Sequence, residues 1–386
     1  MPNLVELESA MPVAPLKLLA LDSCKELGDR VNEYLVDFRK NVHNDIKQDP
    51  AFRGYSEENY LIKAACPRFG SGEGKGVLSE SVRGKDVFLM VDVCNHSLTY
   101  TVNGCENHKS PDDHYQDLKR MIAAIAGKAH RINVIMPFLY ESRQHKRNAR
   151  ESLDCALALQ ELSDMGVESI ITFDAHDPRV QNAIPLKSFE TVPPIYQFIK
   201  AMLKNVPDLH INSDKMMIIS PDEGAMSRAV YFANVLNLDI GMFYKRRDYS
   251  TIINGRNPIV AHEFLGSDIE GKDVVIIDDM ISSGESAIDV AKELKRRKAN
   301  RIFIVATFGL FSQGLDGMDM AYNEGLVDSL YTTNLTYCSE ELLEKPYYKK
   351  VDMSEQLAEL FDTINYDASF SALTDQTALI KQLLNK

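Results

Sequence analysis

The stretch Val274-Val-Ile-Ile-Asp-Asp-Met-Ile-Ser-Ser-Gly-Glu-Ser286 decides the predicted fold. It begins with four apolar residues, as in a strand buried on both faces, and continues into two carboxylates and a loop of small residues. In an open α/β sheet, ligands bind at the C-terminal ends of the strands, and the N-terminus of the next helix offers free N–H groups to an anion. The stretch therefore predicts a phosphate-binding loop made of Ser282, Ser283, Gly284 and Ser286.

The paired carboxylates of this stretch, Asp278 and Asp279, have a different predicted role. They would repel a phosphate, so they suit sugar hydroxyls or a metal ion that bridges to one. The simpler alternative is an acidic cap on an ordinary helix, since Asp and Ser are favoured at helix N-caps. We favour the binding loop because a four-residue apolar strand, paired aspartates and a Ser/Gly loop rarely occur together.

Strand-sized apolar runs recur on both sides of this stretch and are nearly continuous, as expected of a parallel sheet with both faces covered. They are Val87–Val93, Ile132–Leu139, Ser169–Phe173, Met216–Ile219, Ile240–Tyr244, Val274–Ile277 and Ile302–Thr307. Amphipathic, helix-like segments lie between them: Tyr115–Ala129, Ser152–Met165, Ser227–Leu236 and Ser286–Lys298. This alternation predicts a doubly wound α/β protein with mainly parallel sheets.

The alternation occurs twice, in Ile132–Asp177 and again in Met216–Gly284, which predicts two similar α/β domains. We place them at residues 1–187 and 188–386. Two further segments, 25–64 and 95–113, are expected to be insertions in the first domain. Between two strand-like runs, the polar segment Lys245–Pro258 is predicted to be a long functional or mobile loop.

Composition limits the possible partners. Lys and Arg total 43 and Asp and Glu total 56, and the resulting net charge of −13 argues against nucleic acid or a membrane surface as the main partner. An anionic substrate would need a local basic cluster or a divalent metal. The six cysteines form no CxxC pair, so neither a zinc site nor a disulfide framework is expected. Glu6 and Glu8 stand where a signal peptide has lysines, and no apolar run approaches the ~18 residues of a membrane span, so we expect a cytoplasmic protein.

The stretch 274–286 resembles the phosphoribosyl-diphosphate loop that type I phosphoribosyltransferases share with ribose-phosphate pyrophosphokinases. Further segments resemble the pyrophosphokinases in particular and occur in the family's order, within a resemblance that runs from about Leu16 to Tyr337. They are Arg68-Phe-Gly-Ser-Gly-Glu73, Phe138-Leu-Tyr-Glu-Ser-Arg-Gln144, Ile171-Thr-Phe-Asp-Ala-His176, Ile218-Ile-Ser-Pro-Asp-Glu-Gly224 and Lys245-Arg-Arg247. Any one match has an ordinary explanation, such as a solvated charge run for Lys245–Arg247. Their shared order is specific.

The resemblance implies two domains of phosphoribosyltransferase type I-like fold and the transfer of diphosphate from ATP to the 1-hydroxyl of ribose 5-phosphate. It also implies a homo-oligomer, with dimers assembling into a hexamer, and Mg²⁺ as cofactor, with His176 and Asp222 near the metal. The implied roles are catalysis by Lys245 and Arg247, ATP binding by Phe69, Glu73, Arg143 and Gln144, and ribose 5-phosphate binding by Asp222, Asp278, Asp279, Ser282, Ser283, Gly284 and Ser286.

Several substitutions depart from the family pattern, among them Ser282 in place of an acidic residue. Three others bear on the function: Ser71 and His145 replace aspartates, and Glu285 replaces a small residue. They favour one alternative, a non-catalytic regulatory subunit associated with the pyrophosphokinase. A type I phosphoribosyltransferase is the other alternative, but it would not need the ATP-side segments or a duplicated domain. Because a carboxylate would repel the substrate's phosphate, we expect Glu285 to point outward at the start of its helix, where the helix dipole favours it.

Overall fold

The computed structural model describes residues 11–40, 54–125, 127–247, 259–369 and 371–384. The chain divides into two compact units. Unit 1 contains Met1–Pro193, Asn334–Tyr337 and Asp352–Asp375. Unit 2 contains Pro194–Thr333, Cys338–Val351 and Gln376–Lys386. Each unit has its own parallel sheet, as the sequence predicted.

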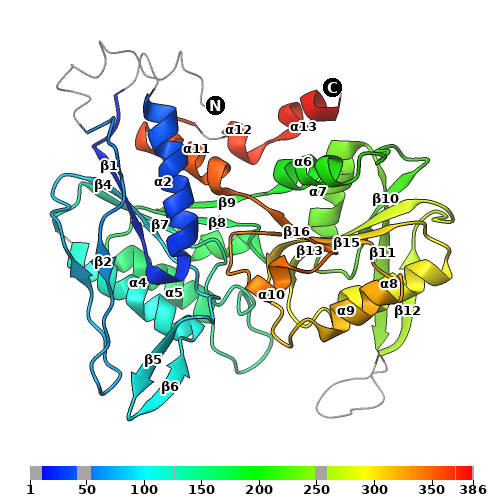
Figure 1. Ribbon diagram of the computed structural model, residues 1–386, viewed down its shortest axis with the longest axis horizontal. Helices are drawn as coiled ribbons and strands as arrows, with labels where there is room; N and C mark the ends of the chain where they lie inside the picture. The colour runs from blue at the N-terminus through cyan, green and yellow to red at the C-terminus, as the bar shows by residue number, and fades with distance from the viewer. Residues whose placement is uncertain (1–10, 41–53, 126, 248–258, 370, 385–386) are drawn as a thin grey trace. The chain divides into compact units, whose positions relative to one another are not determined.

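Unit 1 is built on a parallel sheet in the order β1-β4-β7-β8-β9, with helices on both faces (Figure 1). Its strands are β1 (Leu16–Ala20), β4 (Asp86–Met90), β7 (Arg131–Ile135), β8 (Ser169–Phe173) and β9 (Ser188–Val192). Helices α2 (Lys25–Lys40) and α11 (Ser354–Asn365) cover one face, and α4 (Pro111–Ile125) and α5 (Asp154–Asp164) cover the other. Every residue of β4 and β8 is buried, which explains why these strands read as continuous apolar runs.

The C-terminal segment completes unit 1 through buried polar contacts. Arg39 in α2 is fully buried, and its Nε donates to Asp362 Oδ1 of α11 at 2.7 Å. Asn365 Nδ2 donates to Asp86 Oδ2 at 2.9 Å, and Arg131 pairs with the same carboxylate at 2.7 Å. Breaking one partner of a buried pair strands a charge, so these contacts hold the segment firmly in unit 1.

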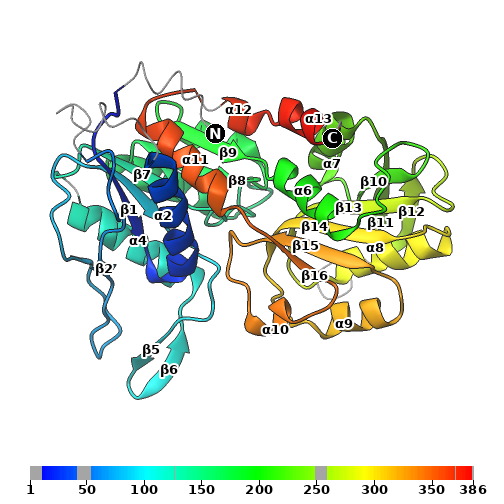
Figure 2. The same ribbon diagram turned by 45° about the horizontal axis from the view of Figure 1, so that its top comes forward.

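Unit 2 contains a seven-stranded sheet in the order β12-β11-β10-β13-β14-β15-β16, in which only β12 is antiparallel to its neighbour. The strands are β10 (Met216–Ser220), β11 (Asp239–Arg247), β12 (Ile259–Leu265), β13 (Asp273–Ile281), β14 (Ile302–Gly309), β15 (Ser329–Thr333) and β16 (Tyr348–Val351). Helices α6 (Ile195–Asn205) and α7 (Met226–Leu236) lie on one face, and α8 (Glu285–Arg296) and α9 (Asp316–Asn323) lie on the other (Figure 2). Val274 and Ile276 of β13 pack in one core cluster with Val290 and Leu294 of α8, which fixes that helix on the sheet.

Shorter elements complete the described chain. They are η1 (Asp22–Cys24), β2 (Ala64–Ala65), β3 (Val77–Leu78), β5 (Thr99–Val102), β6 (Cys105–His108), η3 (Pro178–Ala183), α10 (Glu340–Leu343), α12 (Ser371–Thr374) and α13 (Thr377–Leu384). Strands β5 and β6 form an antiparallel hairpin inside the segment 95–113. Asn103 and Gly104 at its turn both have positive φ, 51° and 77°, as a two-residue hairpin turn requires. No helix in the described ranges is long and apolar enough to cross a bilayer.

The doubly wound α/β class is confirmed, and each predicted strand run overlaps an observed strand. Three details differ. The first sheet ends with β9, which lies beyond residue 187, and part of the C-terminal segment belongs to unit 1. Lys245–Arg247 were predicted in a loop but lie in β11, because pairing with β12 prolongs that strand. Residues 248–258 of that loop and 41–53 of the first insertion lie outside the described residues.

Candidate active site

The paired carboxylates lie near the C-terminal end of β13, between the parallel neighbours β10 and β14. The strand continues to Ile281, so Asp278 and Asp279 are still within it and not in the loop after it. Asp279 is buried, and its backbone N–H donates to Asp278 Oδ1 at 2.8 Å. Burial and the adjacent Asp279 raise the pKa of Asp278 well above its ordinary value, whereas Arg228 acts in the opposite direction. Ionisation of Asp278 is therefore disfavoured relative to a free aspartate, and the oxygens of the pair can accept hydrogen bonds from sugar hydroxyls.

The loop after β13 leads directly into α8. Gly284 at the N-cap has φ +82°, which suits a residue without a Cβ, and it has no side chain that could cap the first turn. Ser282 is held by the segment after β14, because its carbonyl accepts from Ser312 N at 2.9 Å and the two hydroxyls lie 3.0 Å apart. Ser283 Oγ lies 3.4 Å from the Glu285 amide. This is the arrangement in which helix N-termini bind phosphate groups.

Glu285 occupies an exposed position in the first turn of α8, as the sequence argument requires. Ser286 beside it is also exposed. Ser312 was not identified from the sequence. The feature that could have pointed to Ser312 is its position after a neighbouring strand of the same sheet, because the C-terminal ends of parallel strands share one edge.

Asp222 follows β10 at the same edge of the sheet, because β10 and β13 are adjacent and parallel. Its carboxylate Oδ1 accepts from the amides of Gly224 at 3.0 Å and Ala225 at 3.3 Å, so the side chain shapes the turn before α7. Ser220 Oγ donates to the carbonyl of Asp222 at 2.7 Å. These bonds fix the orientation of the Asp222 carboxylate in unit 2.

The backbone of Lys245 and Arg247 lies in β11, opposite His262 and Ile259 of β12. The pairing register shifts between Arg246 and Arg247, which marks an irregularity in the hairpin. Bulges of this kind redirect side chains and occur often beside active sites. The hairpin thus bears two candidate catalytic residues on the same unit as the phosphate loop.

In unit 1, the segment Phe69–Glu73 forms a tight loop. Phe69 N donates to Glu73 O at 2.7 Å, and Gly72 N donates to Phe69 O at 2.8 Å. Ser71 Oγ donates to Glu73 Oε2 at 2.8 Å, so the residue that replaces the family's aspartate orients a predicted ATP-binding carboxylate. Phe69 remains 52% exposed, which is unusual for a phenylalanine and suits stacking on a base.

The other candidate residues of unit 1 follow β7 and β8. Arg143 is exposed, whereas Gln144 Nε2 donates to Ser152 O at 2.7 Å. The rings of His145 and His176 lie 5.2 Å apart, and His145 Nε2 is 3.5 Å from Asp177 Oδ2. His145 Nδ1 is buried without a hydrogen-bond partner in the described residues. The structure therefore groups His145 with His176, which are 31 positions apart in the sequence.

Donor chemistry at the sheet edge of unit 2 fits Mg²⁺. The described residues contain no group of three or more His, Cys, Asp or Glu side chains arranged to hold a metal ion. Mg²⁺ does not need such a cage, because it usually binds one or two carboxylates, keeps several waters and takes its remaining ligands from substrate phosphates. Asp222, Asp278 and Asp279 supply carboxylates of this kind.

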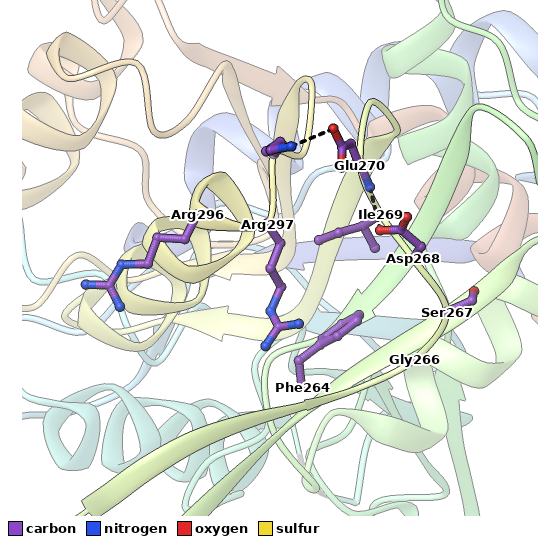
Figure 3. A pocket seen from close by; sticks show the side chains of 9 residues that line it. Phe264, Gly266, Ser267, Asp268, Ile269, Glu270, Arg296 and Arg297 are labelled. Atoms are coloured by element: carbon purple, nitrogen blue, oxygen red, sulfur yellow. Dashed lines mark hydrogen bonds and ion pairs between the residues drawn. The ribbon is translucent and has the colours of Figure 1, made fainter.

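A pocket of about 300 Å³ opens elsewhere in unit 2, at the C-terminal end of α8 (Figure 3). The Arg297 guanidinium lies over the Phe264 ring at 5.0 Å, and Lys298 pairs with Glu270 at 2.8 Å. Because α8 has twelve residues, ~18 Å of helix separates this pocket from the phosphate loop. The pocket is therefore a separate surface.

Comparisons with known proteins agree with this geometry. The family model of the N-terminal domain of ribose phosphate pyrophosphokinase matches residues 16–166, and that of the phosphoribosyl transferase domain matches residues 185–317. The chain is 28% identical over 342 residues to a ribose-phosphate pyrophosphokinase of Vibrio cholerae, covering 87% of this chain and 98% of the relative. It is 29% identical over 318 residues to that of Burkholderia pseudomallei, covering 81% and 90%. The crystal structure of phosphoribosylpyrophosphate synthetase from Mycobacterium smegmatis has the same fold, with a TM-score of 0.71 at 21% identity over 92% of this chain and 99% of that one.

Proposed function

The chain belongs to the ribose-phosphate pyrophosphokinase family, and we propose that it transfers the diphosphate of ATP to the 1-hydroxyl of ribose 5-phosphate. One observation carries the proposal. The half-buried Asp278 and the buried Asp279 lie in the strand directly before α8, whose N-cap is Gly284, a residue with no side chain to cap the amides of the first turn. A sugar phosphate has hydroxyls for the first feature and a phosphate for the second.

Ribose 5-phosphate would bind in unit 2. Amides and hydroxyls of Ser282–Ser286 would donate hydrogen bonds to the 5-phosphate, and the carboxylates of Asp278, Asp279 and Asp222 would accept hydrogen bonds from the ribose hydroxyls. This arrangement of charges favours binding of the 5-phosphate, because the carboxylates precede the phosphate loop in the chain and Glu285 is exposed. An acidic protein can thus hold an anionic substrate without a large basic surface.

ATP would bind with its base on Phe69 and with polar contacts from Glu73, Arg143 and Gln144. In the reaction, the 1-hydroxyl oxygen bonds to the β-phosphorus, the bond between that phosphorus and the α,β-bridging oxygen breaks, and AMP leaves while the hydroxyl proton is released. Lys245 and Arg247 would stabilise the charge on the phosphates. Asp222 in unit 2 and His176 in unit 1 are each proposed as metal-side residues, and Mg²⁺ would neutralise phosphate charge.

A regulatory subunit is the second candidate function, and the substitutions at Ser71, His145 and Glu285 are the observation that favours it. Two of these substitutions are compatible with the proposed site, since Ser71 donates a hydrogen bond to Glu73 and Glu285 is exposed. His145 lies beside His176 and is compatible with either function.

A single assay separates these functions. AMP formation from ATP is measured with Mg²⁺, with and without ribose 5-phosphate. The proposed enzyme forms AMP only when the sugar phosphate is present. A regulatory subunit binds nucleotide without forming AMP, whereas a phosphoribosyltransferase consumes phosphoribosyl diphosphate when a nucleobase is supplied. Assembly into a hexamer, taken from the resemblance, and a cytoplasmic location, taken from the sequence, are further parts of the proposal.

A further inference from the structure

The hairpin β5–β6 has one face turned towards the rest of unit 1. Exposure alternates along β5: Thr99 and Thr101 are exposed, whereas Tyr100 and Val102 are half-buried. Every residue of β6 is exposed. Successive side chains of a strand point to opposite faces, so Tyr100 and Val102 share the covered face. This face meets the loop Arg68–Glu73.

The first contact is between Val102 and the backbone of Gly72. A Cβ built on Gly72 would lie 3.0 Å from Val102 Cγ2, closer than nearly all real Cβ contacts. Gly72 also has φ +91°, a conformation that residues with a side chain rarely adopt. Glycine therefore allows both the tight turn of the loop and the close approach of the hairpin.

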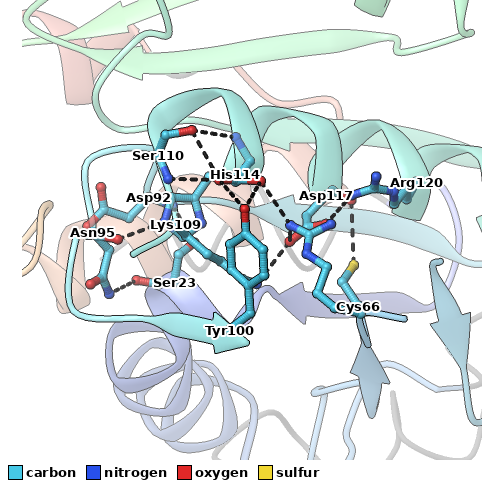
Figure 4. Close-up of polar contacts among 12 residues, drawn as sticks. Ser23, Cys66, Asp92, Asn95, Tyr100, Lys109, Ser110, His114, Asp117 and Arg120 are labelled. Atoms are coloured by element: carbon cyan, nitrogen blue, oxygen red, sulfur yellow. Dashed lines mark hydrogen bonds and ion pairs between the residues drawn. The ribbon is translucent and has the colours of Figure 1, made fainter. Parts of the chain in front are cut away.

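The second contact is between Tyr100 and Arg68, at the base of the same loop. The Arg68 guanidinium lies 5.2 Å from the centre of the Tyr100 ring. The Tyr100 hydroxyl is 3.4 Å from both carboxylate oxygens of Asp113, at the start of α4 (Figure 4). Arg68 also approaches Asp113, at 3.5 Å. Aromatic ring, cation and carboxylate together tie the hairpin to the loop and to α4.

The buried carboxylate of Asp117 connects the base of the loop with the base of the hairpin. Asp117 pairs with Arg68 at 3.0 Å, with Lys109 at 2.9 Å and with Arg120 at 2.7 Å. Lys109 follows β6 directly, and its backbone N–H donates to Leu98 O at 2.8 Å, which closes the hairpin. Figure 4 shows Lys109 and Arg120 directed to Asp117 from opposite sides. The loop and the hairpin are thus anchored on the same side chain of α4.

We propose that the hairpin Thr99–His108 is a brace that orders the loop Arg68–Glu73 and thereby raises the affinity for ATP. This inference rests on the proposed function, which assigns that loop to the nucleotide. Ordering a free loop costs conformational entropy, so a loop that is ordered before binding gives tighter binding. Tyr100 and Val102 are positioning residues in this scheme, because they act through Arg68 and Gly72 and do not contact the substrate.

The test compares Tyr100→Ala/Val102→Ala with two controls. Thr101→Ala changes the exposed face of the same strand, and Tyr100→Phe keeps the ring over Arg68. Calorimetry gives Kd for ATP without ribose 5-phosphate, so that no turnover occurs, and steady-state kinetics gives kcat and both KM values. We expect the double variant to raise Kd and KM for ATP about tenfold. Its kcat and KM for ribose 5-phosphate should stay within about twofold of the wild type, as should every value of the controls.

Hydrogen exchange provides a readout that does not depend on catalysis. Amides of Phe69 and Gly72 should exchange faster in the double variant than in Thr101→Ala. The proposed role of the hairpin would be refuted if the double variant had an unchanged affinity for ATP. It would also be refuted by an equal loss of affinity for both substrates, or by a large fall in the melting temperature. A wild-type protein that binds ATP but forms no AMP would refute the proposed function, while the ATP affinities still decide the brace. A wild-type protein that binds no ATP would refute both.

Discussion

The proposed ribose-phosphate site in unit 2 and the proposed nucleotide site in unit 1 are built in different ways. Most of the proposed ribose site, namely Asp278, Asp279 and the loop Ser282–Ser286, occupies nine consecutive residues on one strand and one helix, and Asp222 joins it from the end of the adjacent strand β10. In unit 1, Phe69, Arg143 and His176 come from three separate segments. Arg143 follows β7 and His176 follows β8, whereas Phe69 lies between the short strands β2 and β3. A contiguous site is positioned by local secondary structure, whereas a dispersed site depends on packing around it.

This difference predicts where each side is vulnerable. On the ribose side, a single substitution in the loop should remove binding without affecting the fold of unit 2. On the nucleotide side, residues that never touch ATP, such as those of the hairpin, should affect its affinity. The predictions below test this contrast.

The largest effect is expected for Ser283→Asp. The substitution places a fixed negative charge at the start of α8, where the 5-phosphate is proposed to bind. Two unit charges ~4 Å apart repel by about 4 kcal/mol at an effective dielectric constant of 20, which corresponds to roughly a thousandfold loss of affinity. Calorimetry should show this loss for ribose 5-phosphate and an unchanged Kd for ATP. Ser283→Ala is the matched control, and equal losses in both variants would exclude a phosphate at this position.

Lys245→Ala tests the catalytic assignment on β11. Losing one preorganised donor to the charged phosphates should lower kcat at least about a hundredfold, with little change in the KM for ribose 5-phosphate. Arg246→Ala is the neighbouring control for a general effect of charge. If kcat is the same in wild type and Lys245→Ala, the triplet Lys245–Arg247 is only a solvated charge run.

Asp92 provides a test of pH dependence in unit 1. Asp92 is buried just after the end of β4, and its two carboxylate oxygens accept hydrogen bonds from the amides of Cys94 and Tyr337 at 2.8 Å each. Burial raises its pKa from 3.8 to about 7. Because the native pKa exceeds that of the unfolded chain, the native state binds more protons between these values. The free energy of unfolding therefore falls as the pH rises from about 4 to about 7.

Denaturation of wild type and Asp92→Asn at pH 5 and pH 8 isolates this contribution, since other titrating groups cancel in the difference. Wild type should lose ~3 kcal/mol more stability than the variant between the two pH values, about 1.4 kcal/mol for each of the two pH units below the native pKa. A difference that does not change with pH would mean that Asp92 stays ionised in the native protein. Ribose 5-phosphate affinity should not follow this titration, because Asp92 belongs to unit 1.

The same contrast explains how much the sequence could predict. The loop 274–286 was recognisable because its apolar run, its carboxylates and its small residues are adjacent. The hairpin β5–β6 was missed even though Asn103-Gly104 is a strong turn signal, since its strands are polar and short and six of their eight residues are exposed. The return of α11 to unit 1 depends on Arg39 and Asp362, which are 323 positions apart and have no local pattern.

Glu285→Gly has the smallest expected effect and bears on the regulatory alternative. Glu285 is exposed in the first turn of α8, where the helix dipole favours a carboxylate. Glycine removes that charge and adds backbone freedom, so the free energy of unfolding should fall by about 1 kcal/mol. Glu285→Gln removes the charge but keeps a good helix former, and it should lose about half as much.

Neither Glu285 variant should change the affinity for ribose 5-phosphate, because an outward carboxylate does not compete with the 5-phosphate. A carboxylate that filled the phosphate site would behave differently. Its removal would increase sugar-phosphate affinity tenfold or more, since each ~1.4 kcal/mol of relieved repulsion is a factor of ten. That increase, together with no AMP formation by the wild type, would replace the enzyme by a nucleotide-binding subunit whose ribose site is blocked by its own side chain. Calorimetric titration of both variants with ribose 5-phosphate decides between these outcomes.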